Sequence, residues 1–332
     1  MEYRINPFAS GNINKKRKVV LVAPEKFALF SFDHRHALLS FIKHIRTAIK
    51  KKIPIHIDFS QVKELHPCGT LLFAAELFRI NNNLKLSSVL SCNYPKELVV
   101  EQMFQHIGLL ELFNKNERTK ITFDNVVHWS FHKGHSLEEL KELSSIKENF
   151  TDPLGHELSH RLLSGISEAI INCFHHAYIE KRNDEINLPS ESGWWLFTQQ
   201  KDGLISVSIC DLGIGIPRSL PKSQLYTVDE LQERLAVIGL GSSKDSNYIK
   251  AAIDHGITRT GQGHRGKGLS EIINVVKRAN KGGIRIFSNK GAYNYNSATD
   301  SEKYIEDDRS IMGTIIQWTF PVDQLEGASQ NE

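Results

Sequence analysis

An apolar hairpin in the second half of the sequence is the feature that most constrains how this chain can fold. Two apolar runs, 194–200 and 204–211, flank the dipeptide Asp202-Gly203, and Asp-Gly between apolar runs is a strong signal for a tight antiparallel turn. After Asp152-Pro153, apolar residues recur at helical spacing and predict a long amphipathic helix. Its apolar stripe consists of Leu158, Leu162, Ile166, Ala169, Ile170 and Phe174. We therefore expect the carboxy-terminal half to pair a long helix with antiparallel sheet.

The amino-terminal half alternates strand and helix patterns, which is typical of an α/β arrangement, a sheet covered by helices. Strands are predicted at 19–22 and 53–59, and helices at 36–50 and 68–81. A charged, leucine-spaced stretch at 136–148 predicts a helix that joins the two halves. The length of 332 residues suits two domains, each with its own core. The predicted organisation is a flexible tail (1–18), an α/β domain (19–130), a linker helix (131–150), a second α/β domain (151–325) and a short tail (326–332).

Composition narrows the class of protein. Apolar residues make up 40% of the chain and the formal charge is +3, so a globular protein is expected and nucleic acid is not an expected partner. The basic run 15–18 is interpreted as a solvated lead-in to the first strand. The four cysteines lack the spacing of a zinc site or a disulfide framework. No apolar stretch approaches membrane-spanning length and the start lacks a signal segment, so a cytoplasmic protein without a membrane partner is expected.

Two polar residues on the predicted long helix are candidates for water and metal chemistry. Glu168 and Asn172 lie four residues apart, so their side chains share one face of the helix. A carboxylate there would orient a water molecule, and the amide oxygen would complete the shell of Mg²⁺, which prefers oxygen ligands. A plain polar stripe on a helix has the same spacing, so the pair by itself leaves the choice open.

A second candidate follows the apolar strand 205–210 directly. The segment Asp211–Gly215 reads Asp-Leu-Gly-Ile-Gly. A carboxylate at a strand end accepts a hydrogen bond from an exocyclic amine, and glycines let a flat ring approach the backbone. An ordinary glycine turn is the alternative for this motif.

The third candidate is a glycine-rich stretch at 261–269 that opens an amphipathic helix through Ile272, Ile273 and Val276. Free backbone N–H groups and the dipole at a helix start attract anions. Arg265 and Lys267 add positive charge suited to a polyphosphate. A mobile loop that tethers two elements is the alternative.

Taken in order, these segments resemble the N box and the glycine boxes of the GHKL ATPase superfamily, which includes gyrase, heat-shock chaperones, histidine kinases and MutL. The matching words are EAIIN from Glu168, DLGIG from Asp211, GKGL from Gly266, and Gly313-Thr314 before an apolar strand. The resemblance spans about residues 157–321. It implies a Bergerat-type α/β sandwich that binds ATP and Mg²⁺.

The resemblance also implies roles for individual residues. Glu168 would be the general base for the attacking water and Asn172 the Mg²⁺ ligand. His176, with Ala177, matches an extension of the N box, and His175 would lie near the phosphates, although a histidine of the protein core is an equal alternative for His175. Asp211 would bind the adenine amine, in a pocket lined by Gly213 and Gly215, with Thr314 in support. The residues around the phosphates would be Gly263, Arg265, Gly266, Lys267, Gly268 and Leu269.

The segment between the second and third motifs corresponds to the ATP lid of that superfamily. It runs from Arg218 to Gly263 and carries helical patterns at 228–237 and 249–255. A lid with its own helices is expected to be a folded flap. Its ordering by nucleotide would then be the switch of the protein.

Residues 56–77 of the amino-terminal half resemble the central strand, loop and helix of a STAS domain, the fold of anti-anti-sigma factors. That family carries Asp-Ser-Ser-Gly with a phosphorylated second serine, whereas this chain has His66-Pro67-Cys68-Gly69. We therefore expect a STAS-like domain that docks or scaffolds a partner and is not phosphorylated there. Cys68 is interpreted as a buried thiol near a helix start.

These expectations combine into an ATP hydrolase, or a switch driven by ATP-dependent lid closure, that acts on a protein partner. One alternative is a protein serine kinase like the anti-sigma factors, with a separate protein as substrate. Another is a nucleotide sensor without turnover. A sensor histidine kinase is disfavoured because a short segment joined to an α/β domain precedes the N box, where a phosphoacceptor hairpin would be needed. A homodimer remains open.

Overall fold

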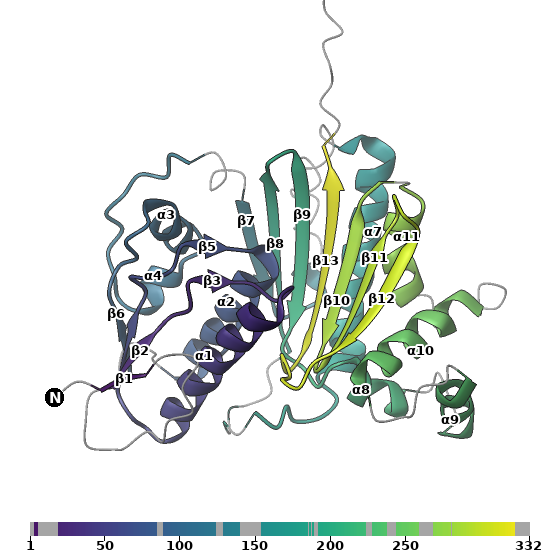
Figure 1. Ribbon diagram of the computed structural model, residues 1–332, viewed down its shortest axis with the longest axis horizontal. Helices are drawn as coiled ribbons and strands as arrows, with labels where there is room; N and C mark the ends of the chain where they lie inside the picture. Colours follow the sequence, from purple (N-terminus) through teal and green to yellow (C-terminus); the bar gives the residue numbers. More distant parts are fainter. Residues whose placement is uncertain are drawn as a thin grey trace, which may run out of the picture.

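The computed structural model describes most of the chain in two units that pack against each other (Figure 1). None of the helices in the described part has the length and apolar character needed to cross a membrane. The described residues are 3–5, 19–84, 89–123, 129–139, 154–184, 186, 188, 192–223, 228–237, 244–258, 268–279 and 281–322.

The amino-terminal unit is built on a four-stranded parallel sheet in the order β1-β2-β4-β6. The predicted strands and helices of this half are confirmed, and residues 3–5, predicted as part of a flexible tail, instead form β1. The sheet strands are β1 (Tyr3–Ile5), β2 (Val19–Val22), β4 (Ile55–Asp58) and β6 (Leu90–Cys92), and β3 (Lys26–Phe27) pairs with β5 (Glu64–Leu65). The helices are α1 (Phe32–Lys50), α2 (Pro67–Asn83), α3 (Leu98–His106) and α4 (Leu109–Leu112).

Helix α2 is buried all round. Every residue from Pro67 to Ile80 is buried, including the charged residues Glu76 and Arg79, because this mostly apolar helix is packed on both sides. One side packs in the amino-terminal unit, and the other contacts β8 (Trp194–Lys201) and β9 (Leu204–Asp211) of the second unit. Cys68, in its first turn, is 1% exposed, which confirms the predicted buried thiol.

The carboxy-terminal unit is a seven-stranded antiparallel sheet in the order β12-β11-β10-β13-β9-β8-β7. The β8–β9 hairpin is confirmed, and its turn residues Asp202 and Gly203 both have positive φ, at 52° and 69°. The remaining strands are β7 (Trp129–Gly134), β10 (Gly283–Ser288), β11 (Gly291–Asn296), β12 (Ser301–Glu306) and β13 (Thr314–Pro321).

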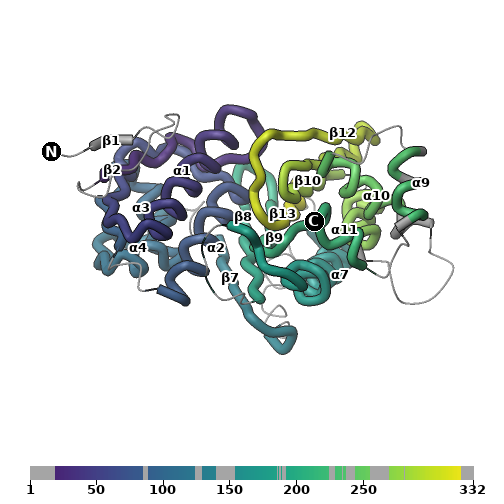
Figure 2. The backbone as a smooth tube through the Cα atoms, turned by 90° about the horizontal axis from the view of Figure 1, so that it is seen from below, coloured from purple at the N-terminus to yellow at the C-terminus, as the bar shows by residue number. Residues whose placement is uncertain are grey.

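Both faces of this sheet are covered. Along β8, Trp194 and Leu196 pack into a core with α7 (His156–Asn172), α10 (Asp245–Thr258) and α11 (Gly268–Lys277). Trp195 and Phe197, on the opposite face, belong to the core of the amino-terminal unit. Figure 2 shows α2 and the helices α7 and α11 on opposite sides of the strands. The carboxy-terminal unit therefore has a core of its own, as expected, but the core of the amino-terminal unit is not confined to that unit, because it continues onto the other face of the sheet.

The predicted domain boundary is also wrong. Residues 131–134 were assigned to a linker helix, but they belong to β7, which pairs with β8 along its whole length. The carboxy-terminal unit thus begins near Trp129. Its aromatic side chain is buried beside Phe197. Most of the predicted linker helix, 140–150, lies outside the described residues.

The predicted flap contains helices, as expected. They are α8 (Ile216–Ser219), the 3₁₀ turn η4 (Leu220–Lys222), α9 (Val228–Val237) and α10. Leu220, Leu231, Leu235 and Ala251 form a small core of their own in this segment. A salt bridge between Lys222 and Glu180 joins η4, near the start of the flap, to the segment that follows α7.

Candidate functional site

Glu168 and Asn172 lie at the carboxy-terminal end of α7, and both are half-buried. The apolar stripe of α7 packs against the sheet, and Glu168 and Asn172 lie at the edge of that stripe. Partial burial raises the pKa of Glu168, and the nearby carboxylate of Glu271 on α11 raises it further, while His175 lowers it. A carboxylate with a raised pKa is a better general base near neutral pH than an ordinary exposed glutamate.

Helix α7 ends in a π turn, η3 (Cys173–Ala177), which carries both histidines of the predicted N box. His175 is exposed, which is against the alternative of a core histidine, and His176 is half-buried. Burial and the neighbouring His175 lower the pKa of His176. Such π turns are rare in proteins, and those that do occur are frequently found at functional sites.

Asp211 is the last residue of β9 and is buried, at 7% exposure. Its Oδ1 accepts a hydrogen bond of 2.9 Å from the backbone N–H of Gly213. Burial raises its pKa to about 6, and hydrogen bonds from Gly213 and Thr314 and the charge of Arg182 act in the opposite direction. Thr314 lies opposite Asp211 in the β9–β13 pair. The carboxylate of Asp211 is therefore fixed in place. Its hydrogen bonds and the charge of Arg182 only partly offset the effect of burial on its ionised form.

The glycine turn after Asp211 is locked against the end of η3. The backbone N–H of Ile214 donates to the carbonyl of Ala177 at 2.7 Å. A Cβ on Gly213 would lie 2.2 Å from the same carbonyl oxygen, so only glycine fits there. Gly215 has φ +77°, and a Cβ on it would clash with the side chain of Asn289. The first two sequence motifs thus meet in space through Ala177.

Replacing Gly213 by alanine is expected to lower the free energy of unfolding by about 1 to 3 kcal/mol, because the clash is with backbone that must move. Gly283→Ala is the matched control, since its new Cβ would come no closer than 3.2 Å to the carbonyl oxygen of Tyr295. Urea denaturation of both variants measures the difference. Equal stability of the two variants would contradict the close contact.

The third motif is described only from its last two residues. Gly268 begins α11, and Leu269 is half-buried and packs on the core between the helices and the sheet. Helix α11 packs along α7, and the carboxylate of Glu271 in its first turn helps to raise the pKa of Glu168. Gly263, Arg265, Gly266 and Lys267 lie outside the described residues.

Several residues around Asp211 were missed by the sequence analysis. Asn289, in the β10–β11 turn, has φ +51° and donates from Nδ2 to the carbonyl of Ile214 at 2.8 Å. Ser288 accepts the N–H of Ile216 at 2.8 Å and lies 3.1 Å from the hydroxyl of Thr314. The hydroxyl of Tyr178 accepts the N–H of Leu212 at 3.0 Å. Asn and Gly in 288–291 signal a turn, but nothing local indicates which loop the turn contacts.

One further group brings possible metal ligands together. Nε2 of His36 lies 2.8 Å from Asp307 and 2.7 Å from Asp308, at the contact between the two units. Arg35 also pairs with Asp307, at 3.4 Å. Because Arg35 already neutralises the carboxylate of Asp307, we interpret the group as an ion-pair cluster between the units.

Comparison of the chain with models of known protein families and with curated proteins found no match. The functional assignment therefore depends on the geometry of the site.

Proposed function

We propose that the carboxy-terminal unit is a GHKL-type domain of the Bergerat fold that binds Mg-ATP, and that the amino-terminal unit is STAS-like. The protein then hydrolyses ATP, or uses ATP-dependent closure of the segment 218–263, to act on a protein partner. A seven-stranded antiparallel sheet with a helical layer on one face supports the first part. A small parallel sheet covered by helices supports the second.

One observation carries the proposal. The buried carboxylate of Asp211 and its glycine turn are held against the end of the helix that bears Glu168 and Asn172. An acceptor for an exocyclic amine and a base with an oxygen ligand for Mg²⁺ are thereby placed on two contacting segments. These are the groups that an adenine nucleotide and its hydrolysis require.

The fate of γ-labelled ATP, incubated with Mg²⁺ and the purified protein, tests the proposal. Release of labelled phosphate by the native chain, but not by Glu168→Ala, would support hydrolysis. Glu157→Ala is the matched control, because Glu157 lies in the first turn of α7 and its side chain is 80% exposed. Label retained on protein would indicate a kinase, and intact bound ATP a nucleotide sensor. Absence of binding by the native chain would refute the proposal.

A further inference from the structure

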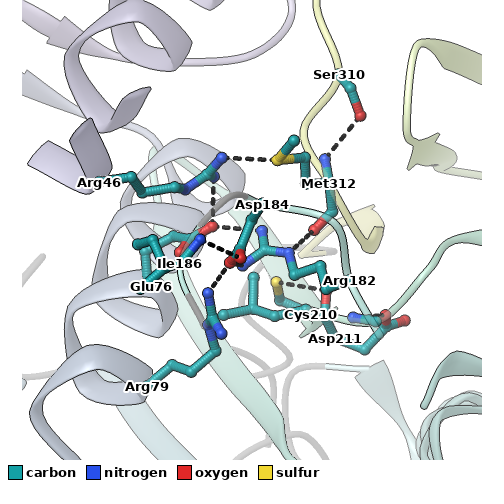
Figure 3. A network of polar contacts seen from close by, with 12 residues as sticks. Arg46, Glu76, Arg79, Arg182, Asp184, Ile186, Cys210, Asp211, Ser310 and Met312 are labelled. Atoms are coloured by element: carbon teal, nitrogen blue, oxygen red, sulfur yellow. Dashed lines mark hydrogen bonds and ion pairs between the residues drawn. The ribbon is translucent and has the colours of Figure 1, made fainter. Parts of the chain in front are cut away.

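A buried ion-pair network joins α1 and α2 to the segment that follows η3 (Figure 3). Glu76 of α2 accepts a hydrogen bond of 2.5 Å from Arg46 of α1. The same carboxylate oxygen accepts a hydrogen bond from Arg182 of the carboxy-terminal unit. These cations hold the pKa of Glu76 well below its usual range. Glu76 therefore joins the two units as a buried anion.

The network carries more positive than negative charge. Arg79 pairs with Asp184, which also lies 3.5 Å from Arg182. Three guanidinium groups thus face two carboxylates, which leaves a net charge of +1 in a buried place. Such an excess is unfavourable unless another anion lies close by. Asp211 lies beside Arg182 (Figure 3), and the positive charge of Arg182 favours its ionised form.

Arg182 also fixes the backbone beside Asp211. Its Nε donates to the carbonyl of Met312 at 2.7 Å, two residues before Thr314. Arg46 lies 2.7 Å from the sulfur of the same Met312. Because Thr314 and Asp211 are partners across the β9–β13 pair, these contacts hold both at the same end of the sheet.

Helix α1 reaches the glycine turn by a second route. Nη2 of Arg35 donates to the carbonyls of Asn289 and Arg309, each at 3.2 Å. Asn289 in turn holds the carbonyl of Ile214, within the glycine turn itself. Arg35 is 3% exposed, so this contact is buried. Two independent contacts from the amino-terminal unit therefore converge on the loops around Asp211.

We propose that α1 and α2 form the back wall of the nucleotide site, and that Arg182, held by Glu76, is a positioning residue for Asp211 and Thr314. This inference rests on the proposed function. The amino-terminal unit is then part of the site and sets its affinity for nucleotide. The charge of Arg182 keeps Asp211 in the ionised form that accepts a hydrogen bond from the adenine amine.

Three neighbours of Asp211 do not change charge in the relevant pH range. Cys173 of η3 donates to the carboxylate of Asp211 at 3.9 Å, and Tyr178 and Cys210 lie close enough to feel its charge. Burial raises the pKa values of all three groups well above the ordinary ones. They stay neutral between about pH 5 and pH 8. Among the charged groups near Asp211, Arg182 is the one that favours its ionised form. A change in the charge of the network should therefore change the pH at which Asp211 titrates.

The test is the affinity of the full chain for Mg-ADP, measured by calorimetry between about pH 5 and pH 8. Native affinity should fall as the pH drops through about 6, where Asp211 takes up a proton. Loss of the cation in Arg182→Met should move this midpoint upward by about one pH unit. Loss of the anion in Glu76→Gln should move it downward. A purely structural role would weaken binding in both variants without shifts of opposite sign.

Arg118→Met is the matched control. Arg118 forms an arginine–glutamate pair with Glu101 inside the amino-terminal unit, so its loss should leave the midpoint unchanged. If Arg182→Met does not fold, Glu76→Gln decides: a downward shift supports the inference, and an unchanged or raised midpoint overturns it. A common midpoint in all variants would overturn this inference alone. Failure of the native chain to bind Mg-ADP at any pH would overturn the proposed function as well.

Discussion

Replacing Glu168 by glutamine is expected to lower the rate of ATP hydrolysis by about 10²- to 10⁴-fold, which is the usual contribution of a general base. Glutamine keeps the shape of the side chain but cannot take a proton from water. Affinity for Mg-ATP should stay nearly unchanged, because the substitution leaves Asn172 and Asp211 in place. Phosphate release under saturating ATP measures the rate, and equilibrium titration measures the affinity.

The pH profile adds a second readout to this prediction. Glu168 acts as a base only when it is ionised, and its pKa is raised by burial and by Glu271. The native rate should therefore decline on the acidic side at a higher pH than an ordinary glutamate would cause. Glu157→Gln, an exposed change on the same helix, should keep both rate and profile. An unchanged rate in Glu168→Gln would exclude Glu168 as the base.

Replacing Phe197 by alanine is expected to lower the free energy of unfolding by about 3 to 5 kcal/mol, the usual loss for a large buried aromatic side chain. Phe197 is fully buried, and its ring lies 5.1 Å from Phe131, which stacks at 5.3 Å on Phe78 of α2. The cavity would open between the two units. Phe32→Ala is the control, because Phe32 is 64% exposed and its loss should cost about 0.5 kcal/mol or less.

The shared core also predicts that both units unfold together. All four tryptophans, Trp129, Trp194, Trp195 and Trp318, lie in strands of the seven-stranded sheet, so their fluorescence reports on the unfolding of that sheet. Alkylation of the buried thiols of Cys68 and Cys92, scored separately from that of Cys173 and Cys210, reports on the amino-terminal unit. The two signals should change at the same denaturant concentration. Separate midpoints would contradict a continuous core.

Local pattern predicted the elements that carry the candidate site. The apolar stripe of α7, the β8–β9 hairpin and the helix α9 lie where the periodicity placed them. Strand β7 was missed because its partner β8 begins 60 residues later in the chain, and pairing over that distance leaves no local signal. Two local signals did indicate burial on both sides: the unbroken apolar run from Trp194 to Phe197, and the mostly apolar sequence of α2.

The sequence by itself determined which side chains are available and in which element each one lies. Glu168 and Asn172 share a helix face, and Asp211 ends a strand, because helical and strand periods act over a few residues. Only the tertiary structure decided that Gly213 contacts Ala177, and that Glu76 and Arg182, 106 residues apart, share a buried ion pair behind Asp211. Such contacts form only when the whole chain packs, because they depend on the shapes and charges of segments that are far apart in the sequence. The spacing of residues along the chain does not predict them.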